Sequence, residues 1–361
     1  MEETAKKPIG HNGSTSLNHE IKEFLLKRGA IKVGFATCET LEGGPPSTDL
    51  SYILPEARSA IGFAMPLDRE KIRSYISKKD FLAHERDNLK TNLKVDNACK
   101  ELAKWLDEKG FLSKALRSNN VYRKEIPGWQ LTMPPELSHR YIAVRSGVGS
   151  FGWSGNVGIK SYGTAIILGS VVTSAELSPT EPIPPEESFC TKCKLCVSFC
   201  AGEMFSREEE TTVTIGGETF SYSKRVNCLR CTFVCGGFTG LHPSGKWSTW
   251  SPGRFDIPKE DNKLRSALLR GVSKYRRWPG RSEGDGGFEN PAAPGINLRL
   301  TCGNCGIMCF GDKDKTRENY RLLTNAGCVI QREDGEILVL PSDEAAKVFE
   351  EMDGKHKRMY Q

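Results

Sequence analysis

The sequence lacks the features of an exported or membrane-spanning chain. Its first residues, MEETAKKPIGHNGS, contain no apolar core and no twin-arginine pair. No run approaches the roughly 18 apolar residues that a membrane helix needs. We therefore expect a cytoplasmic protein with no membrane partner, in a reducing compartment where clustered cysteines bind metal more often than they form disulfides.

A strong charge imbalance is also missing. The 51 Lys and Arg residues nearly balance the 45 Asp and Glu residues, which leaves a net charge of +6. This mild excess does not by itself indicate a nucleic-acid partner. The length of 361 residues is enough for two domains with a sizeable core.

Cysteine, by contrast, is abundant, with 13 residues. The stretch 189–200 (FCTKCKLCVSFC) has the spacing C-x2-C-x2-C-x3-C, in which three thiolates bind one iron–sulfur cubane and the fourth usually ligates a second cluster. The alternatives to iron–sulfur clusters are a zinc site and a disulfide framework. A zinc site needs only four ligands, which usually come from two C-x2-C pairs. The spacing predicts iron–sulfur clusters. Ten cysteines form three groups: Cys190, Cys193, Cys196 and Cys200; Cys228, Cys231 and Cys235; Cys302, Cys305 and Cys309.

The first half of the chain predicts alternating helices and strands. Helical spacing of apolar residues runs from Ser16 to a stop at Gly29, and again over 87–109. Apolar, β-branched runs predict strands over 31–36, 60–65 and 163–173.

A glycine-dense block precedes the last of these strands. Its spacing does not match G-x-G-x-x-G followed by a helix, which argues against a dinucleotide-binding fold. Glycines beside a buried strand permit close approach of a flat ligand, and tight turns are the alternative. The candidate ligand contacts are Gly147, Gly149, Gly152 and Gly163.

Prolines in 178–187 predict a stiff linker and a domain boundary. Hairpins are expected over 211–222 and 329–340, followed by a closing helix over 342–352. The segment 259–281 carries eight basic against two acidic residues, with two aromatic residues among them. It predicts either contact with an anionic partner or a solvated helix and loop.

Four sequence blocks, taken with the cysteine spacing, resemble the epoxyqueuosine reductase and reductive dehalogenase superfamily. They are LLKRGAIKVGFA (25–36), LPEARSAIGFAMPL (54–67), RSGVGSFG (145–152) and YGTAIILGSVVTSAEL (162–177). The resemblance covers most of 16–320. It implies an α/β (α+β) chain in which a nitroreductase-like corrinoid-binding domain precedes a bacterial-ferredoxin-like domain with two [4Fe–4S] clusters. The implied division is a tail (1–15), the corrinoid domain (16–182), the cluster domain (183–320, with an insert at 236–300) and a C-terminal hairpin and helix (321–361).

The resemblance also implies the ligand sets. One cluster would be held by Cys190, Cys193, Cys196 and Cys309, and the other by Cys200, Cys228, Cys302 and Cys305. Cys231 and Cys235 are then surplus. They would be spare thiols, alternatives to Cys228, or part of a third metal site.

Several positions depart from the family pattern. Ala201 and Phe310 stand where proline commonly follows the cysteine, and Trp153 and Ser154 replace a lysine and an asparagine. The family's proton-donating aspartate is absent from 131–140. Glu136 and His139 are the titratable substitutes, each with a structural role as the alternative.

The resulting hypothesis is a cobalamin-dependent iron–sulfur oxidoreductase that acts reductively on a small molecule, as reductive dehalogenases do. Reduced ferredoxin or flavodoxin is the expected electron donor. One alternative is an epoxyqueuosine reductase acting on tRNA, although only 52 residues follow Cys309, too few for the helical-repeat tail of such relatives. The other is an electron-transfer protein that has no corrinoid.

Overall fold

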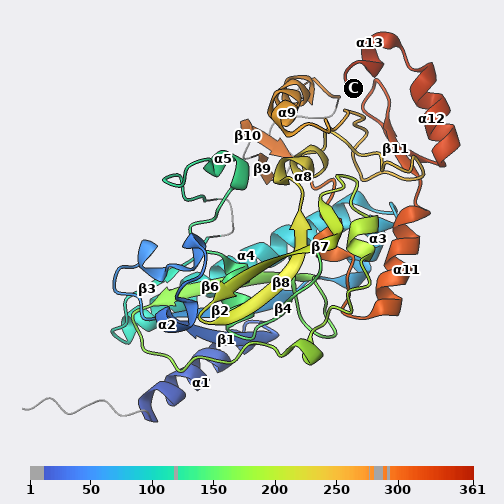
Figure 1. The fold of residues 1–361 in the computed structure, drawn as a ribbon. Coiled ribbons are helices and arrows are strands. Elements are labelled where there is room, and N and C mark those ends of the chain that lie inside the picture. Colours follow the sequence, from blue (N-terminus) through green and yellow to red (C-terminus); the bar gives the residue numbers. More distant parts are fainter. Residues whose placement is uncertain (1–11, 118–120, 276, 280–287, 291–292) are drawn as a thin grey trace, which may run out of the picture.

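A four-stranded antiparallel sheet organises the first half of the computed structural model, which describes residues 12–117, 121–275, 277–279, 288–290 and 293–361. Its strand order is β1 (Lys32–Thr37), β2 (Ser59–Pro66), β6 (Ile166–Thr173), β3 (Ser113–Ala115). All positions of β2 but the last are buried, because helices cover both faces of the sheet (Figure 1).

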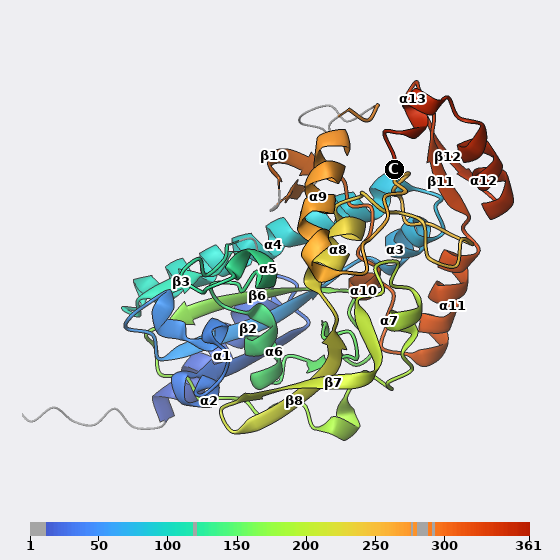
Figure 2. The ribbon, with the colours of Figure 1, turned by 45° about the horizontal axis from the view of Figure 1, so that its top comes forward.

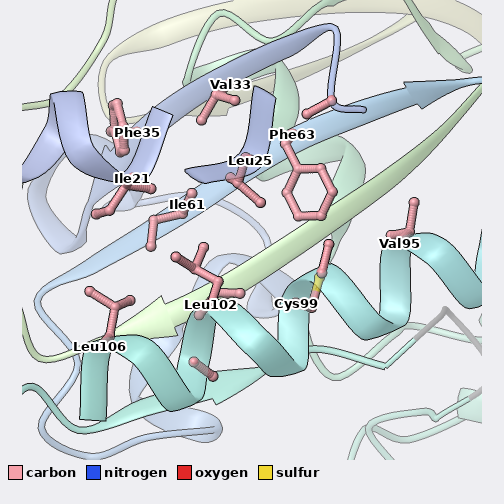
Figure 3. Packing of buried hydrophobic residues seen from close by; sticks show 14 of the residues in the cluster. Ile21, Leu25, Val33, Phe35, Ile61, Phe63, Val95, Cys99, Leu102 and Leu106 are labelled. Atoms are coloured by element: carbon pink, nitrogen blue, oxygen red, sulfur yellow. The ribbon is translucent and has the colours of Figure 1, made fainter. Parts of the chain in front are cut away.

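Two helices, α1 (Asn12–Leu26) and α4 (Phe81–Glu108), cover one face. The side chain of Asp80 starts α4 by accepting hydrogen bonds from the N–H groups of Leu82 and Ala83. The apolar stripe of α4 packs on the sheet at helical spacing (Figure 3). The labelled core residues are Ile21, Leu25, Val33, Phe35, Ile61, Phe63, Val95, Cys99, Leu102 and Leu106.

The opposite face carries the short helix α6 (His139–Arg145), capped by the Ser138 side chain. The helix end lies directly on the sheet because β1 has a glycine there. A side chain at Gly34 would overlap the backbone oxygen of Ser146. The glycine-dense block begins at this helix end, so its position against the sheet is fixed.

A long hairpin, β7 (Phe205–Ile215) and β8 (Glu218–Arg225), joins the two halves of the chain. It reaches from the cysteine-bearing half back to α2 (Cys38–Leu41) and α6 (Figure 2). Ile215 is fully buried in the same apolar cluster as Ala36 and Ile142. The proline-rich segment is docked as well, since Thr180 and Phe35 exchange two hydrogen bonds of 2.9 Å.

The second half is built from short elements around the cysteines. They are α7 (Leu195–Ser198), α8 (Cys228–Cys235), α9 (Asp261–Tyr275), α10 (Asn304–Ile307), α11 (Lys313–Thr324), β11 (Cys328–Gln331), β12 (Ile337–Leu340), α12 (Ser342–Glu351) and α13 (Gly354–Lys357). The remaining elements are α3 (Arg69–Ile76), α5 (Trp129–Thr132), β4 (Ser150–Phe151), β5 (Val157–Gly158), β9 (Phe288–Asn290), β10 (Ala293–Leu298) and the 3-10 turns η1 (Pro46–Thr48), η2 (Leu50–Tyr52) and η3 (Pro185–Glu187).

Most of the predicted elements are present, with shifted ends. The helix expected over 87–109 begins at Phe81, because Asp80 caps it one and a half turns earlier. The strand expected from Gly163 begins at Ile166, because Gly163 has a left-handed φ of 62° and leaves the sheet. Within the described ranges, no helix is long and apolar enough to cross a membrane.

Candidate metal centre

The loop 189–196 folds three cysteines into one compact turn. Lys192 and Lys194 have left-handed φ values of 51° and 58°, which reverse the chain between the cysteines, and α7 then begins at Leu195. Burial raises the pKa of Cys196, and the nearby thiols of Cys190 and Cys193 raise it further.

Cys309 completes this first group from a distant part of the chain. Burial raises its pKa, and Cys190 and Cys193 act on it in the same direction as they act on Cys196. Cys190 and Cys193 thus act on the pKa of both other members of the first ligand set predicted from the resemblance, and the binding of one cluster by all four stays a prediction.

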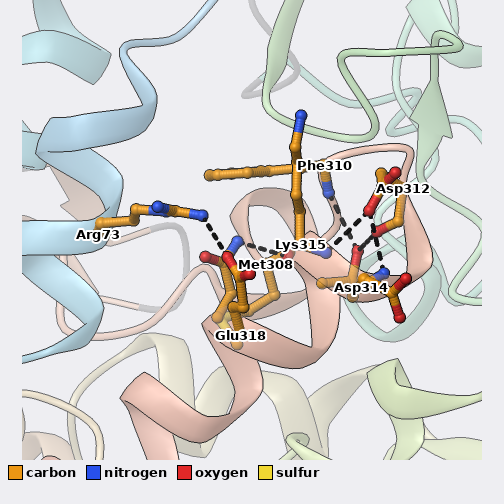
Figure 4. A network of polar contacts seen from close by, with 9 residues as sticks. Arg73, Met308, Phe310, Asp312, Asp314, Lys315 and Glu318 are labelled. Atoms are coloured by element: carbon orange, nitrogen blue, oxygen red, sulfur yellow. Dashed lines mark hydrogen bonds and ion pairs between the residues drawn. The ribbon is translucent and has the colours of Figure 1, made fainter.

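Helix α11 fixes the position of Cys309. Asp312 caps α11, and Thr316 bonds back to the Asp312 carbonyl at 2.6 Å while its hydroxyl lies 3.8 Å from the Cys309 sulfur. An ion pair of 3.0 Å between Arg73 and Glu318 ties α11 to α3 (Figure 4). The residue after Cys309 is Phe310, whose ring is buried beneath this network.

Backbone N–H groups point at two of the sulfurs. Trp153 N–H donates to Cys190 Sγ at 3.3 Å, and Met204 N–H donates to Cys200 Sγ at 3.5 Å. Hydrogen bonds to a thiolate stabilise its charge and raise the reduction potential of a cluster that it binds. The backbone N–H of Trp153 therefore bonds to a predicted cluster ligand, although the Trp153 side chain departs from the family pattern.

The second group contains Cys200, Cys302 and Cys305, as predicted, together with Cys231. Burial raises the pKa of Cys200 to about 11 and that of Cys302 to about 12. The Cys231 thiol lies close enough to raise the pKa of all three. Cys305 also acts on Cys196, so the two groups are adjacent.

Packing along α8 agrees with this grouping. A Cβ at Gly202, just after Cys200, would lie 3.0 Å from the Arg230 carbonyl oxygen. The Thr301 hydroxyl, just before Cys302, donates to the Val234 carbonyl at 3.5 Å. The chain next to both cysteines therefore meets α8 on either side of Cys231.

Cys228 and Cys235 lie elsewhere on α8. Cys228 stands at the first position of the helix, where its charge acts on Arg140. Cys235 is exposed and acts on Cys231 and Tyr122. Sequence reasoning counted Cys231 as surplus, because the resemblance aligns only Cys228 with a family ligand.

All thirteen cysteines are free thiols. Among the described residues, no three His, Cys, Asp or Glu side chains converge as ligands of one ion. In a cubane each cysteine thiolate binds a different iron, so the four cysteine sulfurs lie farther apart than four ligand atoms around one zinc ion.

In the structure, the four glycines predicted to lie against a corrinoid pack against other parts of the chain. Side chains at Gly147 and Gly163 would overlap the backbone oxygens of Glu181 and Cys309. A Cβ at Gly149 would lie 2.6 Å from the Gly158 oxygen, and one at Gly152 would lie 2.8 Å from the Phe189 ring. Glycine is needed here for backbone-to-backbone packing.

The surroundings of these glycines are also filled. Trp153 is only 5% exposed, and its indole N–H donates to the Ser206 carbonyl at 3.0 Å. Phe151 packs on Tyr222 of the long hairpin, with ring centroids 5.0 Å apart. The residues present therefore do not fit a corrinoid against this block.

His139 and Glu136, the predicted proton donors, have different surroundings. The buried His139 ring bonds to the Arg117 carbonyl at 3.0 Å through Nε2 and to the Ser170 hydroxyl at 2.9 Å through Nδ1. Because a carbonyl only accepts, Nε2 carries the proton and Nδ1 accepts from Ser170. Burial lowers the pKa of His139, so the ring is a neutral link between α6 and the sheet. Glu136 is half-buried, and its N–H donates to the Val121 carbonyl.

The basic segment 259–281 forms α9 and the turn after it, except that positions 276, 280 and 281 lie outside the described residues. Its two aromatic residues, Tyr275 and Trp278, are buried in an apolar cluster. Its basic side chains Lys263, Arg265 and Arg270 are exposed. The aromatic rings are therefore not on the surface, where bases would stack on them.

The fold and the cysteine groups define the class: an α/β chain whose second half carries two adjacent groups of buried thiols. No family model matches the chain. An epoxyqueuosine reductase of Atelocyanobacterium thalassa (isolate ALOHA) is 23% identical over 176 residues, which cover 48% of this chain and 51% of the relative. This chain thus spans about half the length of that curated relative.

Similar solved structures carry the same two names. A reductive dehalogenase described in connection with B12-dependent dehalogenation has a TM-score of 0.47 at 15% identity, covering 74% of this chain and 35% of that one. An epoxyqueuosine reductase with a modified tRNA stem loop has a TM-score of 0.40 at 14% identity, covering 96% and 97%. The resemblance predicted from the sequence is confirmed by the name of the curated relative.

Proposed function

We propose that this chain is an oxidoreductase whose redox groups are two [4Fe–4S] clusters. The observation that carries the proposal is the pair of thiol groups, each assembled from at least two distant segments, in which every cysteine but the exposed Cys193 is partly buried. Such sites are built only when the chain folds, and cluster binding would therefore stabilise the fold. Bound iron would keep the thiols deprotonated despite their raised pKa values.

The ligands we assign to the first cluster are Cys190, Cys193, Cys196 and Cys309. Those of the second are Cys200, Cys231, Cys302 and Cys305. The assignment of Cys231 in place of Cys228 rests on its influence on the pKa of the other three cysteines, although the Cys231 thiol itself hydrogen-bonds to Cys235.

Electrons would enter at the first cluster. Cys193 is exposed at the surface, and Lys192 beside it is 60% exposed. Lys194 lies over the Trp153 ring at 4.5 Å, next to the same cysteines. A small acidic carrier such as ferredoxin or flavodoxin would be attracted to these lysines. The influence of Cys305 on the pKa of Cys196 supports onward transfer to the second cluster.

The substrate proposed is a small molecule. The tRNA alternative derives from the name of the curated relative, and exposed basic residues on α9 would suit it. The burial of Tyr275 and Trp278 removes the stacking surface that single-stranded RNA uses. We include no step through a corrinoid, because the chain itself fills the space against the glycine block.

The experiment that tests this function is anaerobic mixing with a reduced donor. Protein with reconstituted clusters is mixed with reduced flavodoxin, and its visible iron–sulfur absorption is followed. About two electrons should enter each chain, one per cluster. The variant Cys196→Ala, which lacks a first-cluster ligand, should accept electrons slowly or not at all. Uptake of no electrons by the intact protein would refute the proposal.

Cobalamin is the second arm of the same experiment. Equilibrium dialysis against micromolar cobalamin should show no binding, because a corrinoid would have to displace the long hairpin and Phe189. A saturable base-off cobalamin signal in paramagnetic resonance would overturn this part and favour the corrinoid-dependent enzyme.

A further inference from the structure

A cavity of about 470 Å³ lies beside the turn that follows Cys200. Ala201 and Glu203 of that turn form one wall, and Arg230 of α8 continues it. Arg254, Cys328 and Phe349 of α12 also line the cavity. Nothing in the sequence pattern pointed to this cavity, because its walls come from six separate segments.

Arg254 is a partly buried cation that bonds to backbone carbonyls and lies 5.7 Å from the centroid of the Phe349 ring. Its guanidinium donates to the carbonyls of Pro252 at 3.0 Å, Gly253 at 2.9 Å and Val329 at 2.8 Å. No carboxylate of the described residues forms an ion pair with it, and burial lowers its pKa to about 10. A buried charge is expensive unless a counter-charge accompanies it.

A second buried cation stands behind the cavity wall. Lys78 is 8% exposed, and its ammonium has no hydrogen-bond partner among the described residues. Cys328 lies near both cations, because its thiol influences the pKa of Lys78 and that of Arg254. Burial raises the pKa of Cys328, so the thiol is neutral at pH 7 and does not balance them.

The acidic residues of the cavity do not supply the missing charge either. Glu203 is 64% exposed and lies 3.6 Å from Arg230, and Glu350 is 74% exposed and bonds to Lys357 at 2.5 Å. Asp256 is exposed at the mouth. The interior therefore has an excess of positive charge that faces an open space.

We propose that this cavity binds a small molecule that carries a carboxylate or phosphate group. The anionic group bonds to the Arg254 guanidinium, which suits planar, bidentate recognition of either anion. The apolar part of the molecule lies between Phe349 and Ala346. A ligand here would lie next to the turn that follows Cys200. The claim that the protein reduces this ligand rests on the proposed function. The claim that the cavity binds it does not.

Calorimetric titration of the anaerobic full-length protein tests the binding. Inorganic phosphate and succinate are the two probes, and the tighter one identifies the anion class. We expect saturable binding of at least one probe at one site per chain. Arg254→Gln should weaken it by at least about tenfold, because the charge-assisted hydrogen bonds are lost.

Two further variants keep the test decisive. Arg73→Gln changes an arginine at a different surface, between α3 and α11, and should leave binding unchanged. Ala346→Trp blocks the mouth from an exposed position without touching Arg254, so it should also weaken binding if Arg254→Gln fails to fold. Absence of binding by both probes, or equal binding by wild type, Arg254→Gln and Ala346→Trp, would overturn the proposal. Iron content measured on the same samples separates this result from failure of the proposed function.

Discussion

The substitution Gly163→Ala separates two explanations of the glycine block. Gly163 has a φ of 62°, and an added Cβ would overlap the Cys309 backbone. The left-handed conformation costs alanine about 1–2 kcal/mol, and forcing the two segments apart costs about 1–3 kcal/mol more. We therefore expect a loss of about 2–5 kcal/mol in the free energy of unfolding, with iron lost from the first group because Cys309 is displaced.

The matched control is Gly29→Ala. Gly29 also has a positive φ, 97°, but no atom lies within 4 Å of its added Cβ. Only the conformational cost of about 1–2 kcal/mol should appear, and iron content should stay normal. Anaerobic urea unfolding followed by circular dichroism, together with iron analysis, measures both effects. Equal losses in the two variants, with normal iron in both, would refute the close-packing argument.

Three further predictions concern the thiols and the buried lysine. Cys231→Ala should lose about four irons per chain, whereas Cys228→Ala should keep its iron; the reverse pattern would contradict our second ligand set. Thr316→Val removes a hydroxyl that lies near the Cys309 sulfur, so it should make the reduction potential of one cluster more negative. Thr324→Val on the same helix should leave the reduction potentials unchanged. Redox titration measures both. Lys78→Met should raise stability by a few kcal/mol at pH 7, and this gain should shrink as pH rises above 8, since the folded pKa of about 8 lies below the ordinary 10.5. A gain that grows with pH in urea unfolding would contradict this reasoning.

Much of the fold could be predicted because its signals are local. The apolar periodicity of α4 and the β-branched run of β6 follow directly from burial against the sheet. The hairpin at Gly216 and Gly217 and the closing pair of β11 and β12 were also predicted from turn residues. Helix α8 was not predicted, because its three cysteines were interpreted as metal ligands and the helical spacing of the segment was not considered.

The site was predictable only as far as the spacing and the resemblance reach. The first ligand set follows from one tight loop plus Cys309, and in the structure Cys190 and Cys193 influence the pKa of both Cys196 and Cys309. The choice between Cys228 and Cys231 depends on which side of α8 meets Gly202 and Thr301, and no local pattern encodes that contact.

The glycine block shows the same limit. A glycine that admits a ligand and one that admits a neighbouring backbone look identical in sequence. Gly147 and Gly163 are of the second kind, because their partners Glu181 and Cys309 lie far along the chain. The position of Arg254 in a cavity could not be predicted either, because the segments that surround it meet only in the folded chain.

The most direct test of the central claim is a count of iron and sulfide in anaerobically reconstituted protein, combined with paramagnetic resonance after reduction. Two adjacent cubanes predict about eight irons and eight sulfides per chain, and a reduced spectrum broadened by coupling between two spins. A reproducible value near four irons, an uncoupled single signal, or zinc in place of iron would contradict it.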